Sequence, residues 1–119
     1  MPTTVAIVDD DNDAREVLAM LLETAGHTVK LYASGILFLA DPDYAEIDCL
    51  IVDQSMPGMS GVQLLMEMDR RGVVIPTLLI TGASDNEIAE QATRLGAMTV
   101  MLKPVAAQTL LNFVAASAG

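Results

Sequence analysis

Basic residues, aromatic residues and cysteine are all scarce in this chain. Its 119 residues include six Lys and Arg against sixteen Asp and Glu, which gives a formal net charge of −10. Nucleic-acid phosphates are bound by clustered Lys and Arg side chains, so we expect no direct nucleic-acid binding by this domain. An acidic surface of this kind favours cations or basic protein faces as partners.

The single cysteine, Cys49, excludes an internal disulfide and indicates a reducing compartment. It lies beside an apolar run, and burial raises the pKa of a thiol, so we predict an inert core residue rather than a nucleophile. No apolar run approaches the ~18 residues that a membrane span needs, and the amino terminus lacks a targeting pattern. The sequence therefore predicts a cytoplasmic protein without membrane association.

Only 3% of the residues are aromatic, whereas 52% are hydrophobic. The core is therefore expected to consist of Val, Ile, Leu, Met and Ala side chains. At this length we expect one compact domain over residues 1–119, with no room for a second.

Short apolar runs alternate with segments of helical spacing. The runs are at residues 5–8, 29–33, 49–52, 78–80 and 99–102, and the helical segments lie within residues 14–25, 36–40, 60–72, 84–96 and 106–116. The expected caps are Asn12 or Asp13 for the first helix and Ser84 or Asp85 for the fourth. The side chains expected to face inward in the first, third and last helices are Val17, Leu18, Leu21, Leu22, Ala25, Val62, Leu65, Met66, Leu110, Leu111 and Val114.

The alternation of strand and helix through short loops predicts an α/β fold with a parallel sheet and helices on both faces. The second run alternates apolar and polar residues, which is typical of an edge strand. The first, third and fourth runs are continuously apolar and therefore central. We predict a single flavodoxin-like (βα)5 domain with strand order 2-1-3-4-5.

Polar side chains follow four of these strands: Asp9 and Asp10 after the first, Asp53 after the third, Thr81 after the fourth and Lys103 after the fifth. In a parallel sheet they gather at the carboxyl edge, where open α/β sheets bind ligands. Clustered carboxylates raise one another's pKa unless cations such as Mg²⁺ and Lys103 compensate. The pattern predicts a Mg²⁺ pocket in which Asp53 attacks phosphorus while Thr81 and Lys103 donate to the phosphoryl oxygens.

The motifs around these residues resemble the receiver domains of bacterial two-component response regulators over essentially the whole chain. The motifs are Val8-Asp9-Asp10-Asp11, Asp53-Gln54-Ser55-Met56-Pro57-Gly58-Met59-Ser60-Gly61, Thr81-Gly82 and Lys103-Pro104. The Met-Pro-Gly-Met-Ser-Gly segment is similar to the subgroup often fused to LuxR-type helix-turn-helix output domains.

The resemblance implies that a sensor histidine kinase or a phosphotransfer protein donates its phosphoryl group to Asp53 in a Mg²⁺-dependent step. It implies Asp10 as a direct metal ligand and Asp9 as a ligand through water, with the backbone carbonyl of Ser55 and the Asp53 carboxylate completing the protein's share. The chain would be no enzyme beyond its own phosphorylation and dephosphorylation. Phosphorylation would then switch a partner or homodimer surface.

Three positions depart from the family pattern. Val100 stands where receivers usually have Tyr or Phe, Thr99 replaces the usual acidic or amide residue before it, and Val105 replaces the Phe after Lys-Pro. These departures leave open a degenerate receiver that acts by protein contact without phosphorylation. The complete acid set and Lys103 count against that alternative.

A phosphohydrolase of the haloacid dehalogenase type combines the same residue types with Mg²⁺. Its nucleophile follows the first strand and precedes a Gly-Thr pair, which segment 9–13 of this chain does not contain. No output domain follows Gly119, so we expect either a stand-alone receiver or a piece of a larger regulator.

Overall fold

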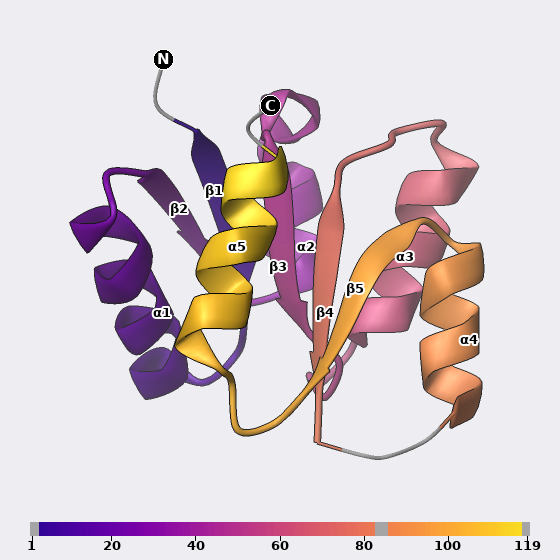
Figure 1. Cartoon of the computed structure of the whole chain (residues 1–119). Helices are drawn as coiled ribbons and strands as arrows, with labels where there is room; N and C mark the ends of the chain where they lie inside the picture. Colours follow the sequence, from indigo (N-terminus) through magenta and orange to yellow (C-terminus); the bar gives the residue numbers. More distant parts are fainter. Residues whose placement is uncertain (1–2, 83–85, 118–119) are drawn as a thin grey trace.

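The structure, a computed structural model, describes residues 3–82 and 86–117 (Figure 1). Its strands are β1 (Thr4–Val8), β2 (Thr28–Tyr32), β3 (Cys49–Asp53), β4 (Thr77–Thr81) and β5 (Ala97–Leu102). Its helices are α1 (Asn12–Thr24), α2 (Gly35–Ala40), the short 3-10 helix η1 (Tyr44–Glu46), α3 (Gly61–Arg70), α4 (Asn86–Arg94) and α5 (Ala107–Ser117). The caps predicted at Ser84 or Asp85 lie outside the described residues.

The strands form one parallel sheet in the order β2-β1-β3-β4-β5, which confirms the predicted flavodoxin-like topology. β2 lies at one edge, as its alternating sequence predicted. The strand order reverses between β1 and β3, so the chain leaves these two neighbouring strands in opposite directions. The carboxyl ends of β1 and β3 are therefore the place where folds of this kind usually bind a ligand.

The helices cover both faces of the sheet (Figure 1). Because successive side chains of a strand point to opposite faces, Val5 and Ile7 of β1 pack with α1 and α5, whereas Ala6 and Val8 pack with α2, α3 and α4. Two hydrophobic clusters thus lie on either side of the sheet. Cys49 is buried in the first of these, and burial raises the pKa of its thiol to about 12, as expected for an inert core residue.

Two helices bury narrower stripes than the periodicity predicted. In α1, Leu18, Ala19 and Leu22 are buried, but Val17 is 67% exposed. In α3, Leu64, Leu65 and Met68 are among the buried residues, but Met66 is 55% exposed. Each helical residue is rotated about 100° from the next, so a residue adjacent to the edge of a narrow stripe turns toward solvent. The inward placement of Val17 and Met66 was therefore wrong, as was that of Ala25, the exposed C-cap residue of α1.

In β2 the buried side does not follow the apolar residues of the alternating pattern. Leu31 is 45% exposed, whereas Tyr32 packs inward against Phe38. Phe38 is fully buried and makes edge contacts with Tyr32 and Tyr44, at ring-centroid distances of 5.2 and 5.4 Å. Three of the four aromatic residues of the chain therefore gather in one cluster between β2, α2 and η1. The purely aliphatic core expected from composition was wrong at this place.

Candidate functional site

The predicted functional residues lie at or just after the carboxyl ends of β1, β3, β4 and β5. Asp9 directly follows β1, Asp53 and Thr81 are the last residues of β3 and β4, and Lys103 directly follows β5. The Lys103 N–H donates to the carbonyl of Thr81 at 2.9 Å, which joins the ends of β4 and β5. The Lys103–Pro104 peptide bond is cis.

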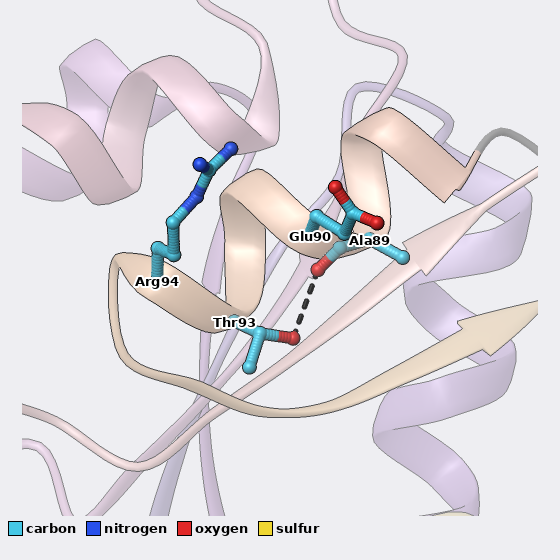
Figure 2. Close-up of a pocket in the computed structure, with 4 residues that line it drawn as sticks. All are labelled: Ala89, Glu90, Thr93 and Arg94. Atoms are coloured by element: carbon cyan, nitrogen blue, oxygen red, sulfur yellow. Dashed lines mark hydrogen bonds between the residues drawn. The ribbon is translucent and has the colours of Figure 1, made fainter.

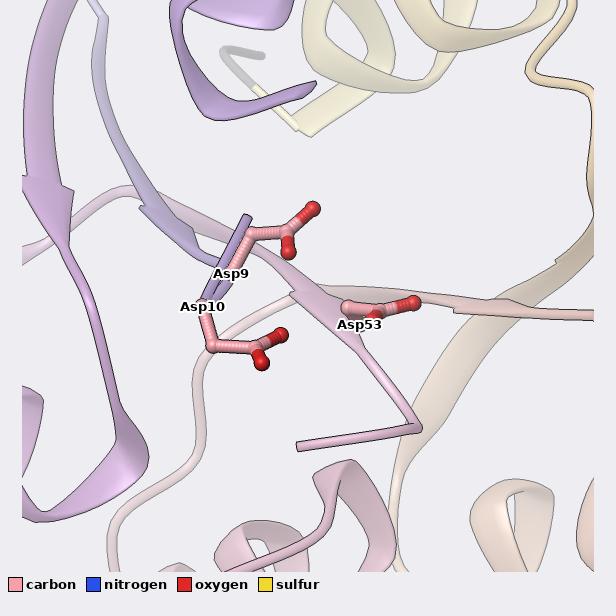
Figure 3. Close-up of side chains that lie close together, drawn as sticks. All are labelled: Asp9, Asp10 and Asp53. Atoms are coloured by element: carbon pink, nitrogen blue, oxygen red, sulfur yellow. The ribbon is translucent and has the colours of Figure 1, made fainter. Parts of the chain in front are cut away.

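Asp9, Asp10 and Asp53 form an acidic cluster at the carboxyl ends of β1 and β3 (Figure 3). One carboxylate oxygen from each residue lies within 4.8 Å of the others, an arrangement that could hold a metal ion. Asp9 is 5% exposed and Asp53 is 4% exposed, whereas Asp10 is exposed. The site therefore combines two buried carboxylates, Asp9 and Asp53, with one that is exposed to solvent, Asp10.

Asp53 is the most confined member of the acidic cluster. Its Oδ1 lies 3.0 Å from Nζ of Lys103, so the two groups form an ion pair. Apart from this ion pair, the buried Oδ1 has no hydrogen-bond partner within the described part of the chain. The Asp53 carboxylate raises the pKa of Lys103, which therefore stays positively charged at neutral pH. Asp53 thus presents a buried oxygen with unused acceptor capacity beside a permanent cation.

Asp9 is held rigidly in the β1–α1 loop. Its N–H donates to the carbonyl of Tyr32 at 3.1 Å, and its Oδ1 accepts from the N–H of Asp11 at 3.0 Å. Burial raises the pKa of Asp9, and the neighbouring Asp53 carboxylate adds to this rise, whereas the hydrogen bond from Asp11 opposes it. The ionised form of Asp9 is consequently disfavoured when no cation is bound.

Asp11 is not part of the acidic cluster. It is the N-cap of α1, where its side chain accepts hydrogen bonds from the N–H groups of Asp13 and Ala14. The cap was predicted at Asn12 or Asp13, one or two residues too late. An acidic cap also suits the positive end of the helix dipole.

The loop after Asp53 is pinned by Gln54 and Gly61. The Gln54 side chain accepts from the N–H of Val62 at 2.8 Å, and its backbone carbonyl accepts from the N–H of Gly61 at 3.1 Å. A Cβ on Gly61 would lie 2.5 Å from a Leu79 methyl group and 3.0 Å from the Asp53 carbonyl. Ser55 is exposed in this loop, and its carbonyl as a metal ligand stays a prediction.

The family departures are on strand β5 and just after it. Val100 is half-buried against the cluster that contains α4, and Val105 packs partly against the cluster that contains α5. Thr99 is also half-buried. None of these three residues belongs to the acidic cluster, so the departures leave the acids and Lys103 intact.

A separate open hollow lies on the surface of α4 (Figure 2). Its described lining residues are Ala89, Glu90, Thr93 and Arg94, and the Thr93 hydroxyl donates to the carbonyl of Ala89 at 2.8 Å. This hydroxyl bond is internal to the helix, and the charged side chains of Glu90 and Arg94 project apart (Figure 2). The hollow shares no residue with the acidic cluster.

The fold and the site together define a flavodoxin-like α/β domain with a cluster of carboxylates at its topological switch point. The model of the response regulator receiver domain family matches residues 5–115, and the chain belongs to this family. Such a domain of a two-component signalling system implies a histidine kinase or another phosphoryl donor as its partner.

Individual relatives agree with this assignment. The chain is 36% identical over 115 residues to the transcriptional regulatory protein FixJ of Azorhizobium caulinodans, covering 97% of the chain and 54% of the relative. It is 39% identical over 106 residues to the C4-dicarboxylate transport transcriptional regulatory protein DctR of Rhodobacter capsulatus, covering 87% of the chain and 54% of the relative. The chain spans about half the length of these curated relatives.

Solved structures share the same fold. The crystal structure of FixJ-N superposes with a TM-score of 0.87 at 33% identity, covering 98% of this chain and 94% of that one. The chemotaxis protein CheY4 of Vibrio cholerae gives a TM-score of 0.88 at 27% identity, with coverage of 98% and 99%. In the described residues, no helix combines the length and apolar character needed to cross a bilayer.

Sequence reasoning missed Arg15 as a neighbour of the site. Its guanidinium donates from Nη1 to the backbone carbonyl of Asp9 at 2.6 Å. The only sequence signal is its position in the first turn of α1, from which a long side chain points back toward the preceding loop.

Proposed function

We propose that the chain is the phosphoacceptor domain of a response regulator, and that a sensor histidine kinase or a phosphotransfer protein phosphorylates Asp53. The observation that carries this proposal is the buried Asp53 carboxylate, which forms an ion pair with Lys103 and belongs to the acidic cluster with Asp9 and Asp10. The family's setting in two-component signalling supports the choice of donor. A cytoplasmic location follows from that choice, because the donor's phosphohistidine is used there.

The proposed step is an in-line displacement at phosphorus. A carboxylate oxygen of Asp53 forms a bond to phosphorus while the bond from phosphorus to the donor's imidazole nitrogen breaks. The electron pair of the broken bond stays on that nitrogen, so the donor leaves as a histidine. Lys103, whose raised pKa keeps it charged, is within reach of the same carboxylate and would balance the incoming phosphoryl charge.

The residues present fit a magnesium ion. Mg²⁺ prefers a few carboxylate oxygens and a carbonyl, and the acidic cluster supplies the carboxylates, one of which has a buried oxygen without a hydrogen-bond donor among the described residues. Asp10 and Asp53 would hold the ion directly, Asp9 through water, and the carbonyl of Ser55 would add a fourth contact. When bound, the metal supplies positive charge at the phosphoryl oxygens.

The chain's own residues bind and orient the phosphoryl group. Thr81 ends β4 beside Asp53, whose backbone pairs with that strand, and its hydroxyl would donate to one phosphoryl oxygen. Lys103 would donate to another. The phosphorylated chain then presents a changed surface to a partner or to a second copy. We also propose that the chain catalyses only its own phosphorylation and dephosphorylation.

Phosphorylation by a small donor tests the proposal. We expect incubation with acetyl phosphate and Mg²⁺ to add one phosphoryl group to the wild-type chain, measured as intact mass. The addition should disappear in Asp53→Asn and without Mg²⁺. Asp69→Asn is the matched control, because Asp69 is an exposed carboxylate on α3, and it should be phosphorylated like the wild type.

Two other results would point to the alternatives. An unmodified wild-type chain would contradict the proposal and favour a receiver that acts by contact alone. Repeated turnover of unrelated phosphate esters would favour a phosphohydrolase.

A further inference from the structure

Arg15 is a cation at the acidic site that none of the proposed steps uses. It is half-buried in the first turn of α1, where Nη1 donates to the carbonyl of Asp9 at 2.6 Å and Nη2 contacts the side-chain oxygen of Asn12. Among the described basic residues that form ion pairs, only Lys103 lies at this site, where it pairs with Asp53. The remaining pairs lie elsewhere: Lys30 pairs with Asp41, and Arg70 and Arg71 pair with Glu67.

The position of Arg15 is unfavourable for the helix alone. The amino end of a helix carries partial positive charge, which disfavours a cation in the first turn. Within the described residues the guanidinium forms no ion pair with a carboxylate. Its two terminal nitrogens instead donate hydrogen bonds to the backbone carbonyl of Asp9 and to the side-chain amide oxygen of Asn12. Neither the helix dipole nor an ion pair accounts for an arginine at this position, which leaves its hydrogen bond to the β1–α1 loop as its main interaction.

The contact completes a three-point attachment of Asp9. The N–H of Asp9 donates to Tyr32, its carboxylate accepts from Asp11, and its carbonyl accepts from Arg15. The first two bonds fix the amide and the side chain of Asp9. The third fixes the peptide that joins Asp9 to Asp10, because the carbonyl of one residue and the nitrogen of the next share a rigid plane.

Asp10 depends on that peptide plane for its direction. It is the exposed member of the acidic cluster, and in the described part of the chain no hydrogen bond holds its carboxylate. Figure 3 shows its side chain directed toward the same space as that of Asp53. The Asp9–Asp10 peptide plane therefore sets where the Asp10 side chain leaves the backbone, and Arg15 holds that plane.

We infer that Arg15 is a positioning residue that aims the Asp9-Asp10 pair at a bound divalent cation. The inference rests on the proposed function, since it concerns the same Mg²⁺ site. Groups that orient metal ligands without touching the metal typically change affinity about 10- to 100-fold when they are replaced. Arg15 holds a backbone carbonyl rather than a ligand side chain, so we expect the low end of this range.

The charge of Arg15 acts in the opposite direction, because a cation repels Mg²⁺. Arg15→Lys separates the two effects: it keeps the positive charge but loses the planar fork that reaches both oxygens. If charge alone mattered, this variant would bind Mg²⁺ as tightly as the wild type. If positioning matters, it binds more weakly.

The test is a Mg²⁺ titration of three proteins: the wild-type chain, Arg15→Lys and Arg94→Lys. Calorimetry measures the Kd, and NMR monitors the backbone amide resonances of residues 9–11. Arg94 is an exposed arginine on α4 and serves as the matched control. We expect about a tenfold weaker Kd for Arg15→Lys and an unchanged Kd for Arg94→Lys. Without Mg²⁺, the Asp10 amide should shift in Arg15→Lys while the melting temperature stays close to that of the wild type.

The outcomes separate the inference from the proposed function. A wild-type chain that binds no Mg²⁺ contradicts the proposed function and the inference together. A wild type that binds Mg²⁺ while Arg15→Lys binds within twofold of it contradicts the inference alone. A large loss of melting temperature in metal-free Arg15→Lys would show a general structural role and would also overturn it.

Discussion

Asp9 is a carboxyl group of the site whose ionised form the fold disfavours. It is buried, and both burial and the Asp53 carboxylate raise its pKa. The folded chain thus binds the Asp9 proton more tightly than the unfolded chain does, so ionised Asp9 lowers stability. We predict that Asp9→Asn increases the free energy of unfolding in Mg²⁺-free buffer at pH 7, because the asparagine side chain carries no charge to bury. Urea unfolding measures this change.

The increase in the free energy of unfolding caused by Asp9→Asn should depend on pH with a definite sign. The increase should be complete at pH values above the raised pKa of Asp9 in the folded chain, where wild-type Asp9 is ionised. It should shrink as pH falls toward the ordinary value of 3.8, because wild-type Asp9 is then protonated in both states. Asp69→Asn, which removes an exposed charge, should show little change at any pH. Equal stabilities of Asp9→Asn and the wild type at pH 7 would contradict the argument.

The sequence predicted Asp9, Asp53 and Thr81 because each ends or follows an apolar run. A parallel sheet brings the ends of such runs together whatever the detailed packing. The contact of Arg15 with the carbonyl of Asp9 was not predictable in this way. It depends on the rotamer of one long side chain and on the path of the preceding loop, and neither leaves a periodic signal.

Among the elements, α3 is fixed most tightly to the site through Gly61 at its first position. A Cβ there would meet Leu79 at 2.5 Å and the backbone of Asp53 at 3.0 Å. Backbone atoms cannot move aside as a flexible side chain can. We predict that Gly61→Ala lowers the free energy of unfolding by about 1–3 kcal/mol through overpacking, and also slows phosphorylation of Asp53 because the loop after it is displaced.

Gly35 provides the comparison, because it also opens a helix and is also buried. A Cβ there would meet Met59 Sδ at 2.9 Å, which is the far part of a flexible side chain. Gly35→Ala should therefore destabilise the chain less than Gly61→Ala and leave the phosphorylation rate unchanged. Chemical unfolding and the acetyl phosphate reaction measure both effects. Similar losses in the two variants would show that the contact with the Asp53 backbone is not the cause.

The helices were predicted less accurately than the strands, and the reason is geometric. A central strand buries both faces, so a continuous apolar run such as that of β3 has only one reading. A helix buries a stripe whose width depends on its neighbours, and Val17 and Met66 lie just outside that stripe. The aromatic cluster around Phe38 was missed because Tyr32 and Tyr44 are brought to it by tertiary contacts alone.

For the molecule as a whole, the strand order followed from the sequence because short crossover connections leave few arrangements open. The same arrangement concentrates charge. The chain carries a formal net charge of −10, and three of its acids converge at the carboxyl ends of β1 and β3. Negative charges therefore repel one another in the folded state, both over the whole surface and among the three acids of the site.

Salt and Mg²⁺ should relieve these two kinds of repulsion differently. NaCl screens surface charges over a Debye length of about 10 Å at 0.1 M, so it stabilises the chain modestly. Mg²⁺ at equal ionic strength adds its binding to the folded site, which by linkage amounts to about 2.7 kcal/mol at one hundred times Kd. We predict a higher melting temperature in MgCl₂ than in NaCl of the same ionic strength, measured by scanning calorimetry.

Two substitutions of equal charge separate the site from the surface. Asp10→Asn and Asp69→Asn each remove one negative charge, so general screening changes equally in both. Only Asp10 belongs to the acidic cluster. The additional stabilisation by Mg²⁺ should therefore vanish in Asp10→Asn and persist in Asp69→Asn. If both variants kept it, the effect of Mg²⁺ would be screening of the whole acidic surface, because a specific site cannot lose a ligand and retain its binding energy.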